Sequence, residues 1–193
     1  MVKKISIVLL AIIMMMSMVS CTSHSDEEII EAAKTLIEKS YEVNEIYFGK
    51  GLPSTGEISL GLVSEYELVD PECGYSTVDQ LKALAAEVYC EDYCEHLYTI
   101  AFKGISNNED EESVSFARYI EDYAGKLTVS LDAKENGLIL NRTYDLSTIT
   151  VEKCVRNTAT VKVQSLVDGQ LDEILTISLV FENDHWRLNT PTY

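Results

Sequence analysis

The spacing of apolar residues changes partway along this 193-residue chain, and that change limits the folds it can adopt. In the first half, apolar residues recur at intervals of three and four, as at Ile29, Ala33, Leu36 and Ile37, which is typical of an amphipathic helix. After about residue 116 they alternate, as in the run 127–131, which is typical of strands. Helices followed by strands predict an α+β domain with its helices on one face of an antiparallel sheet.

Two capping boxes mark where helices should begin. In Ser25-Asp26-Glu27-Glu28 the serine hydroxyl is expected to accept a backbone amide proton of the first turn. The Glu28 side chain is expected to accept the backbone amide of Ser25 in return. This predicts a helix to about residue 48, ended by the glycines and proline of 49–53. Thr77-Val78-Asp79-Gln80 predicts a second helix, with a third helical stretch over about 91–102. A short strand is expected at 66–69.

The second half predicts a meander of four or five antiparallel strands. Asp168-Gly169 lies between two alternating runs and suits a type I′ hairpin turn. A second tight turn is expected at Asn183-Asp184, before a last strand at 186–188. Asn136-Gly137 and Asn157 are expected to form turns between the earlier strands. We expect one strongly bent sheet that encloses a cone with the helices, open at its wide end.

The N-terminus has the order of a bacterial export signal. A positive start at Lys3 and Lys4 precedes an apolar run over 5–19, and the small residue Ser20 stands directly before Cys21. This arrangement resembles the lipobox of bacterial lipoproteins, although Met18 stands where leucine is usual. The resemblance implies cleavage before Cys21, a lipid on its thiol, and a place on the extracytoplasmic face of the cell membrane. An uncleaved anchor and soluble export are the alternatives.

On this interpretation the chain divides into three parts. Residues 1–20 are a lipoprotein signal peptide, 21–25 a polar tether, and 26–193 a single α+β domain. The formal net charge of the whole chain is −17, and loss of the signal with its two lysines makes it −19. Nucleic acids and anionic lipid headgroups require clusters of Lys and Arg, so we expect neither as a ligand. A basic protein partner, a cationic ligand or simple solubility fits this charge.

Four cysteines remain for the domain, and they allow three complete pairings. Cys90 and Cys94 lie four residues apart on a helical stretch, which favours buried thiols. A disulfide that involves Cys73 or Cys154 is the alternative in an exported protein. The paired C-x-x-C spacing of structural zinc is missing, and the acidic run 107–113 lacks the pattern of a calcium loop. We therefore expect no metal and no cofactor.

Three segments resemble a known class of domain. They are the run 180–191, which contains Trp186-Arg187-Leu188, the stretch Tyr47-Phe48-Gly49-Lys50-Gly51-Leu52-Pro53, and Arg142-Thr143-Tyr144-Asp145. Together with the element order they resemble the nuclear-transport-factor-two-like domains of the cystatin-like superfold, and small lipoproteins of this shape, over residues 25–193. The resemblance implies the cone described above. Members of this superfold include isomerases, dehydratases, protein-binding modules and pocket binders, so the fold alone does not select a function.

We expect a membrane-tethered, extracytoplasmic binding or interaction module without catalytic activity. Its partner would be a protein of the cell envelope or a small ligand. Tyrosine offers a flat apolar body with a hydroxyl, which suits an amphipathic ligand or a protein hot spot. The aromatic residues expected to line or rim the cone are Tyr41, Tyr47, Phe48, Tyr98, Tyr119, Tyr123 and Trp186.

The alternative is a small isomerase or dehydratase that uses an acid/base residue in the cone. Such enzymes need a carboxylate or histidine base opposite hydroxyl donors that hold an oxyanion. The candidates are Asp122 or His96 as base, with Tyr98 and Tyr119 as donors. The chain has no G-x-S-x-G motif and no glycine-rich phosphate loop.

Overall fold

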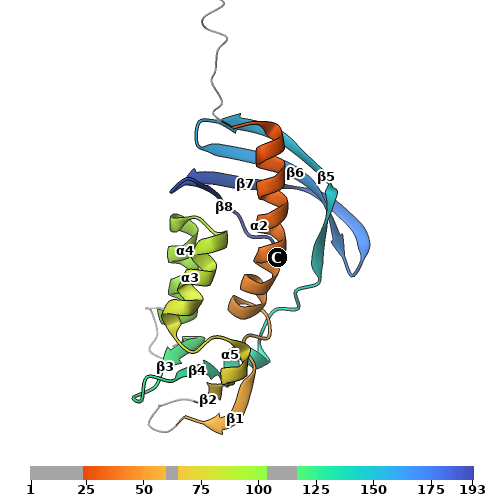
Figure 1. Cartoon of the computed structure of the whole chain (residues 1–193). Coiled ribbons are helices and arrows are strands. Elements are labelled where there is room, and N and C mark those ends of the chain that lie inside the picture. Colours follow the sequence, from red (N-terminus) through yellow and green to blue (C-terminus); the bar gives the residue numbers. More distant parts are fainter. Residues whose placement is uncertain (1–23, 60–64, 104–116) are drawn as a thin grey trace, which may run out of the picture.

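A computed structural model describes residues 24–59, 65–103 and 117–193, and these residues form an α+β fold (Figure 1). They contain four α-helices and two four-stranded antiparallel sheets, neither of which closes into a barrel. The helical elements are α2 (Asp26–Tyr47), η1 (Pro71–Cys73), α3 (Val78–Val88), α4 (Glu91–Tyr98), the π-helical turn η2 (Thr99–Lys103) and α5 (Leu131–Glu135).

The expectation of one bent sheet is corrected, because the strands form two separate sheets. The first sheet has the order β1-β2-β4-β3 and the second the order β5-β6-β7-β8. The expected cone is not shown. The strands are β1 (Ser54–Ile58), β2 (Tyr66–Val69), β3 (Tyr119–Glu121), β4 (Leu127–Ser130), β5 (Arg142–Val155), β6 (Thr158–Val167), β7 (Gln170–Glu182) and β8 (His185–Leu188).

Helix α5 separates the two sheets along the chain. Residues 127–131 were expected to be one strand, but β4 ends at Ser130, whose hydroxyl caps α5 by accepting the amide of Ala133 at 3.4 Å. β4 pairs with β2 and β3 in the first sheet. β5 then begins the second sheet as the neighbour of β6. The turn expected at Asn136-Gly137 therefore follows a short helix rather than joining two strands of one meander.

Helix α2 runs between the two sheets (Figure 1). Ser25 caps it, with its hydroxyl accepting the amide of Glu28 at 3.2 Å. The reciprocal half of the expected capping box is absent, because the Glu28 carboxylate binds the ring of His24 at 2.8 Å instead. The helix packs on β5, β6 and β8 of the second sheet. Its far end meets the first sheet, where the Tyr119 hydroxyl donates to the carbonyl of Ile46 at 2.8 Å.

The other local predictions are confirmed. The capping box of Thr77 and Gln80 is complete at the start of α3. Asp168 and Gly169 have φ angles of 52° and 75°, and Asn183 and Asp184 have 49° and 64°. Two consecutive residues with positive φ are what a type I′ turn requires. β7 and β8 therefore pair in register, with Phe181 opposite Trp186.

The main core lies between α2, α3, α4 and the second sheet. The sheet contributes alternate residues of its strands, including Val161 and Val163 of β6 and Ile177 and Leu179 of β7, each at most 1% exposed. In the register, Val161 lies opposite Ile177, Val163 opposite Leu175 and Leu179 opposite Ala159. The alternation seen in the sequence is thus the alternation between this core and solvent.

A buried polar cluster joins α2 to the last residues of the chain. It consists of Ser40, Asn44, Tyr89 and Thr192, none more than 2% exposed. The Asn44 amide donates to the Thr192 hydroxyl at 2.8 Å and its carbonyl oxygen accepts from the Tyr89 hydroxyl at 2.7 Å. Ser40 and Thr192 share a hydrogen bond of 2.7 Å. We call these four residues the polar lock.

All four cysteines of the domain have free thiols. Cys90 and Cys94 are buried, as expected from their spacing, while Cys73 and Cys154 are half-buried. The Cys90 thiol donates to the side-chain oxygen of Asn189 at 3.0 Å. Burial raises the pKa of the Cys94 thiol to about 11, so this residue stays protonated at neutral pH.

We expect thiol reactivity to follow this difference. In the native chain at pH 8, iodoacetamide should modify Cys73 and Cys154 well before Cys90 and Cys94, because the inner pair is buried away from the reagent and burial also raises the pKa of both its thiols. Peptide mass spectrometry after timed alkylation measures the order. In urea the four rates should become similar. Equal rates in the native protein would contradict the burial of the inner pair.

Candidate functional site

Three of the seven predicted aromatic residues lie in the core. Tyr47, Tyr119 and Trp186 are 2%, 0% and 5% exposed. The Tyr47 hydroxyl donates to the carbonyl of Leu81 at 2.9 Å. The Tyr119 hydroxyl accepts the amide of Leu52 at 3.0 Å while it donates to Ile46. Both hydroxyls are therefore used to connect elements of the fold.

The other four predicted aromatic residues are spread over the molecule. Tyr41, Phe48 and Tyr98 are half-buried, whereas Tyr123 is 88% exposed at a turn. Phe48 packs on Tyr193 with ring centroids 4.3 Å apart. The Tyr98 hydroxyl donates to the carbonyl of Lys82 at 2.9 Å. The seven residues do not gather round one cavity.

The proposed acid/base residues do not converge either. Asp122 lies in the turn before β4, where its carboxylate accepts the amides of Ala124 and Lys126 at 2.8 and 2.9 Å. The hydrogen bond from the Lys126 amide is the main reason that the pKa of Asp122 is lowered, which makes it a poorer base. His96 is exposed on α4. Tyr98 and Tyr119 line one surface hollow together, but neither base is part of its wall.

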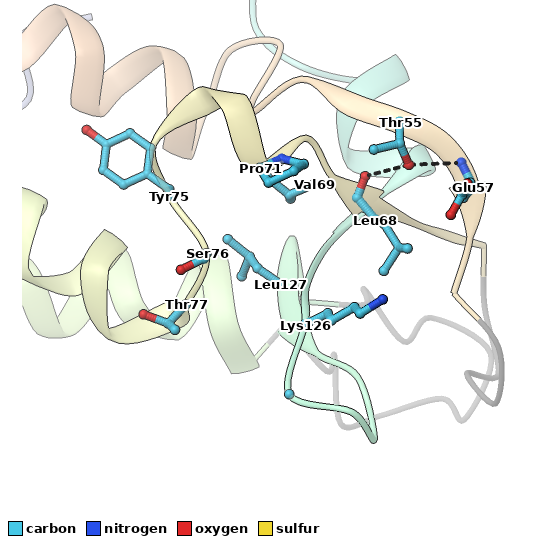
Figure 2. A pocket seen from close by; sticks show the side chains of 11 residues that line it. Thr55, Glu57, Leu68, Val69, Pro71, Tyr75, Ser76, Thr77, Lys126 and Leu127 are labelled. Carbon is cyan, nitrogen blue, oxygen red and sulfur yellow. Dashed lines mark hydrogen bonds between the residues drawn. The ribbon is translucent and has the colours of Figure 1, made fainter.

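A pocket of about 470 Å³ lies on the first sheet, beside the segment that leads into α3 (Figure 2). This volume is within the range of small-molecule sites. We call it the distal pocket, because it lies at the end of the fold away from the start of α2. It is lined by Thr55, Glu57, Leu68, Val69, Pro71, Tyr75, Ser76, Thr77, Gly125, Lys126 and Leu127.

The wall of the distal pocket is mainly apolar. Leu68 and Val69 come from β2 and Leu127 from β4, and Pro71 begins η1. In Figure 2 these side chains lie together between the labelled polar residues. Tyr75 adds a ring, and burial, with Glu42 as hydrogen-bond acceptor, raises the pKa of its hydroxyl to about 12. That hydroxyl donates to Glu42 at 2.7 Å and stays neutral.

The hydroxyls that line the pocket already have partners within the protein. Thr55 donates to the carbonyl of Leu68 and accepts the amide of Glu57. The Ser76 hydroxyl donates to the side chain of Gln80 at 3.1 Å, and Thr77 accepts the Gln80 amide at 3.2 Å. These groups shape the rim of the pocket, and their bonding leaves the charged side chains as its main polar groups.

Two charged side chains remain in the lining. Lys126 and Glu57 are exposed, and the structure gives neither of them an ion pair or a side-chain hydrogen bond within the described ranges. The positive charge of Lys126 contributes to the lowered pKa of Asp122 nearby. An ammonium and a carboxylate thus border an apolar surface.

The opposite end of the fold holds His24, the first residue that the structure describes. The ring of His24 packs on Phe181 and Trp186, with centroid separations of 4.1 and 4.9 Å. Its side chain is only 9% exposed and binds the Glu28 carboxylate at 2.8 Å. His24 was expected to belong to a free polar tether, but it is part of the packed domain.

Comparisons with known proteins add no relative. No protein-family model matches the chain, and no curated protein matches it. Cys21 and the acidic run 107–113 lie outside the described residues. No helix in the described ranges is long and apolar enough to cross a membrane. Among the same residues, no group of three or more His, Cys, Asp or Glu side chains is placed to hold a metal ion.

Sequence reasoning missed the distal pocket. Leu68 and Val69 were expected in the short strand 66–69, which carried no sign of a pocket, and Pro71 and Gly74 follow directly after it. The combination of a short apolar strand with a Pro- and Gly-rich segment was the one available signal, because such segments border functional loops. No local pattern marked Lys126 or Glu57.

Proposed function

We propose that this chain is a lipid-anchored, extracytoplasmic binding module whose ligand enters the distal pocket. The proposal rests on one observation: His24, next to the proposed anchor, and the distal pocket lie at opposite ends of the fold. The ring of His24 packs on Phe181 beside the start of α2, and the pocket is on the first sheet. Figure 1 shows the first sheet at the other end of α2. The anchor and the binding site would then face in opposite directions.

Chain geometry supports this arrangement. Cys21 and His24 are three residues apart, a span of at most about 10 Å. A lipid on Cys21 would therefore hold the start of α2 close to the membrane. The 22 residues of α2 extend about 33 Å at 1.5 Å per residue. The distal pocket would face away from the membrane, where molecules from outside the cell reach it.

The pocket itself supports binding rather than catalysis. It combines an apolar wall with few polar groups, which is the usual make-up of a small-ligand site. The hydroxyls that an isomerase would use, those of Tyr98 and Tyr119, are bonded to backbone carbonyls elsewhere. The relation to nuclear-transport-factor-two-like domains remains part of the proposal. The antiparallel meander β5–β8 packed against α2 supports it.

Metabolic labelling tests the anchor. In a bacterial host, the full-length chain should incorporate a palmitate analogue, and Cys21→Ala should lose essentially all of the label because no thiol remains to be modified. Gel fluorescence of the purified chain measures the label. Cys154→Ala is the matched control and should keep it, because Cys154 lies on β5 within the fold. Label that persists in Cys21→Ala would contradict the anchor.

A further inference from the structure

We infer that the distal pocket binds a short peptide with a free amino group, a free carboxylate and an apolar side chain. This inference rests on the proposed function and names its class of ligand. The apolar wall would take the side chain, Lys126 the carboxylate, and Glu57 the ammonium.

The bonding of the lining leaves Lys126 and Glu57 as its two charged partners for a ligand. Thr55, Ser76 and Tyr75 donate their hydroxyl protons to other groups of the protein, and the Thr77 hydroxyl accepts the backbone amide of Gln80. Lys126 and Glu57 lack such bonds in the part of the chain that the structure describes. A ligand of one charge would satisfy one of these groups and leave the other facing an apolar molecule. A zwitterion satisfies both.

Local backbone structure holds Lys126 in place. Gly125 adopts a φ of +74° at the turn between β3 and β4. The Lys126 amide donates to the Asp122 carboxylate at 2.9 Å, and its carbonyl accepts the Asp122 amide at 2.9 Å. With its backbone bound on both sides, the residue has only its side chain free. Figure 2 shows that side chain extending beside the end of Leu68.

Glu57 is positioned by an irregularity in β1. The pairing of β1 with β2 shifts between Ser54 and Ile58, and Gly56 has a φ of +80°. The Glu57 amide donates to the Thr55 hydroxyl at 3.2 Å, which places Glu57 at the rim of the pocket. In Figure 2 the Leu68 side chain extends into the region between Glu57 and Lys126. A peptide whose side chain contacts Leu68 would then have its two ends near opposite charges.

The same irregularity argues against an added strand at this edge. A bulge bends an edge strand and disturbs the row of groups that a new strand would pair with. The charge of the chain argues against a simple anion such as a fatty acid, because a net charge of −17 repels anions at long range. A zwitterion has no net charge and is not repelled.

Calorimetry with four forms of one dipeptide tests the inference. The full-length chain in detergent micelles is titrated with leucyl-leucine, its N-acetyl form, its C-terminal amide, and the doubly blocked form, with micelles alone as the blank. We expect the free dipeptide to bind most tightly. Each blocked end should cost about fivefold in affinity, the upper range for an exposed ion pair.

Charge variants assign each end of the ligand. Lys126→Gln should remove the preference for a free carboxylate, and Glu57→Gln the preference for a free amino group. The exposed pair Lys162 and Glu152 of the second sheet, 2.6 Å apart, supplies the matched controls Lys162→Gln and Glu152→Gln. These should leave all four affinities unchanged. Equal effects of the pocket and control variants would overturn the inference.

The outcomes separate the inference from the proposed function. Leu68→Asp should abolish binding of all four forms, since it places a charge in the apolar wall. If the four forms bind equally and Leu68→Asp abolishes their binding, the distal pocket is the binding site, but the inference that it selects a zwitterionic peptide is wrong. If none of the forms binds, or Leu68→Asp has no effect, the distal pocket itself is not the site for such molecules and both proposals fail.

Discussion

Replacement of Arg118 by Met should lower the free energy of unfolding by about 2–4 kcal/mol, because one buried and one half-buried backbone carbonyl lose their donor. Arg118 is 7% exposed, directly before β3. Its guanidinium donates to the carbonyl of Ala133 at 3.1 Å and to that of Gly49. These two bonds connect α5 to the turn that follows α2.

The space around Arg118 is too small for another side chain to enter and donate to the same carbonyls. A side chain at Gly51 would lie 2.9 Å from the guanidinium, and Gly51 has a φ of +75°. The Nε atom of Arg118 is buried without a partner among the described residues. Relief of that unmet bond and of the buried charge offsets part of the loss, and the predicted range already includes this offset.

Urea unfolding followed by the fluorescence of Trp186, the single tryptophan, measures the effect. Arg142→Met is the matched control. Arg142 pairs with Asp172 at 2.9 Å near the surface of the second sheet, and such pairs contribute about 1 kcal/mol or less. If both variants lose the same stability, Arg118 does not stabilise the fold through its bonds to the carbonyls of Gly49 and Ala133.

Asn44→Leu should destabilise the fold by about 2–4 kcal/mol, since it removes the central residue of the polar lock. Leucine is similar in size, so the loss comes from hydrogen bonds rather than from a cavity. The Tyr89 hydroxyl loses its acceptor and the Thr192 hydroxyl loses a donor, and both are buried. The remaining contact between those two hydroxyls, at 3.2 Å, compensates only in part.

A second measurement identifies where the fold loosens. Thr192 attaches the last residues to α2, so hydrogen exchange should accelerate first in that segment, including at the amide of Asn189, which bonds the carbonyl of Ser178. Asn136→Leu, at the exposed end of α5, is the control and should change stability by less than about 0.5 kcal/mol. If hydrogen exchange near Asn189 is unchanged in Asn44→Leu, the polar lock does not hold the last residues of the chain against α2.

Local signals predicted the elements that depend on neighbouring residues. The Ser25 and Thr77 caps and the Asp168-Gly169 turn act over two to four residues. The Thr77 box and the turn are present as expected, and Ser25 caps α2 without the reciprocal bond from Glu28. The division into two sheets could not be predicted in this way. β2 pairs with β4, with Tyr66 opposite Ser130, across more than sixty residues. No local pattern determines which of two distant strands becomes the partner.

The candidate site also depends on contacts between distant segments, which local patterns do not predict. The element order suggested a cone, and its aromatic residues were expected to line or rim it, yet Tyr47 and Tyr119 use their hydroxyls to join elements in the core. A tyrosine at a core position and one at a rim have the same local sequence signature. The distal pocket depends on Leu68 and Lys126, which β2 and β4 bring together.

The sequence by itself determined where the helices start, where the hairpins turn, and which strand faces are apolar, because these depend on hydrogen bonds and periodicity within a few residues. The order of a positive start, an apolar run and Ser20-Cys21 also motivates the proposed anchor at Cys21. The tertiary structure alone decided which aromatic residues are buried, that His24 is packed at one end, and that an apolar pocket bordered by two charged side chains lies at the other. Those features arise from contacts between distant segments, and the free energy of such contacts depends on the packing of the whole fold.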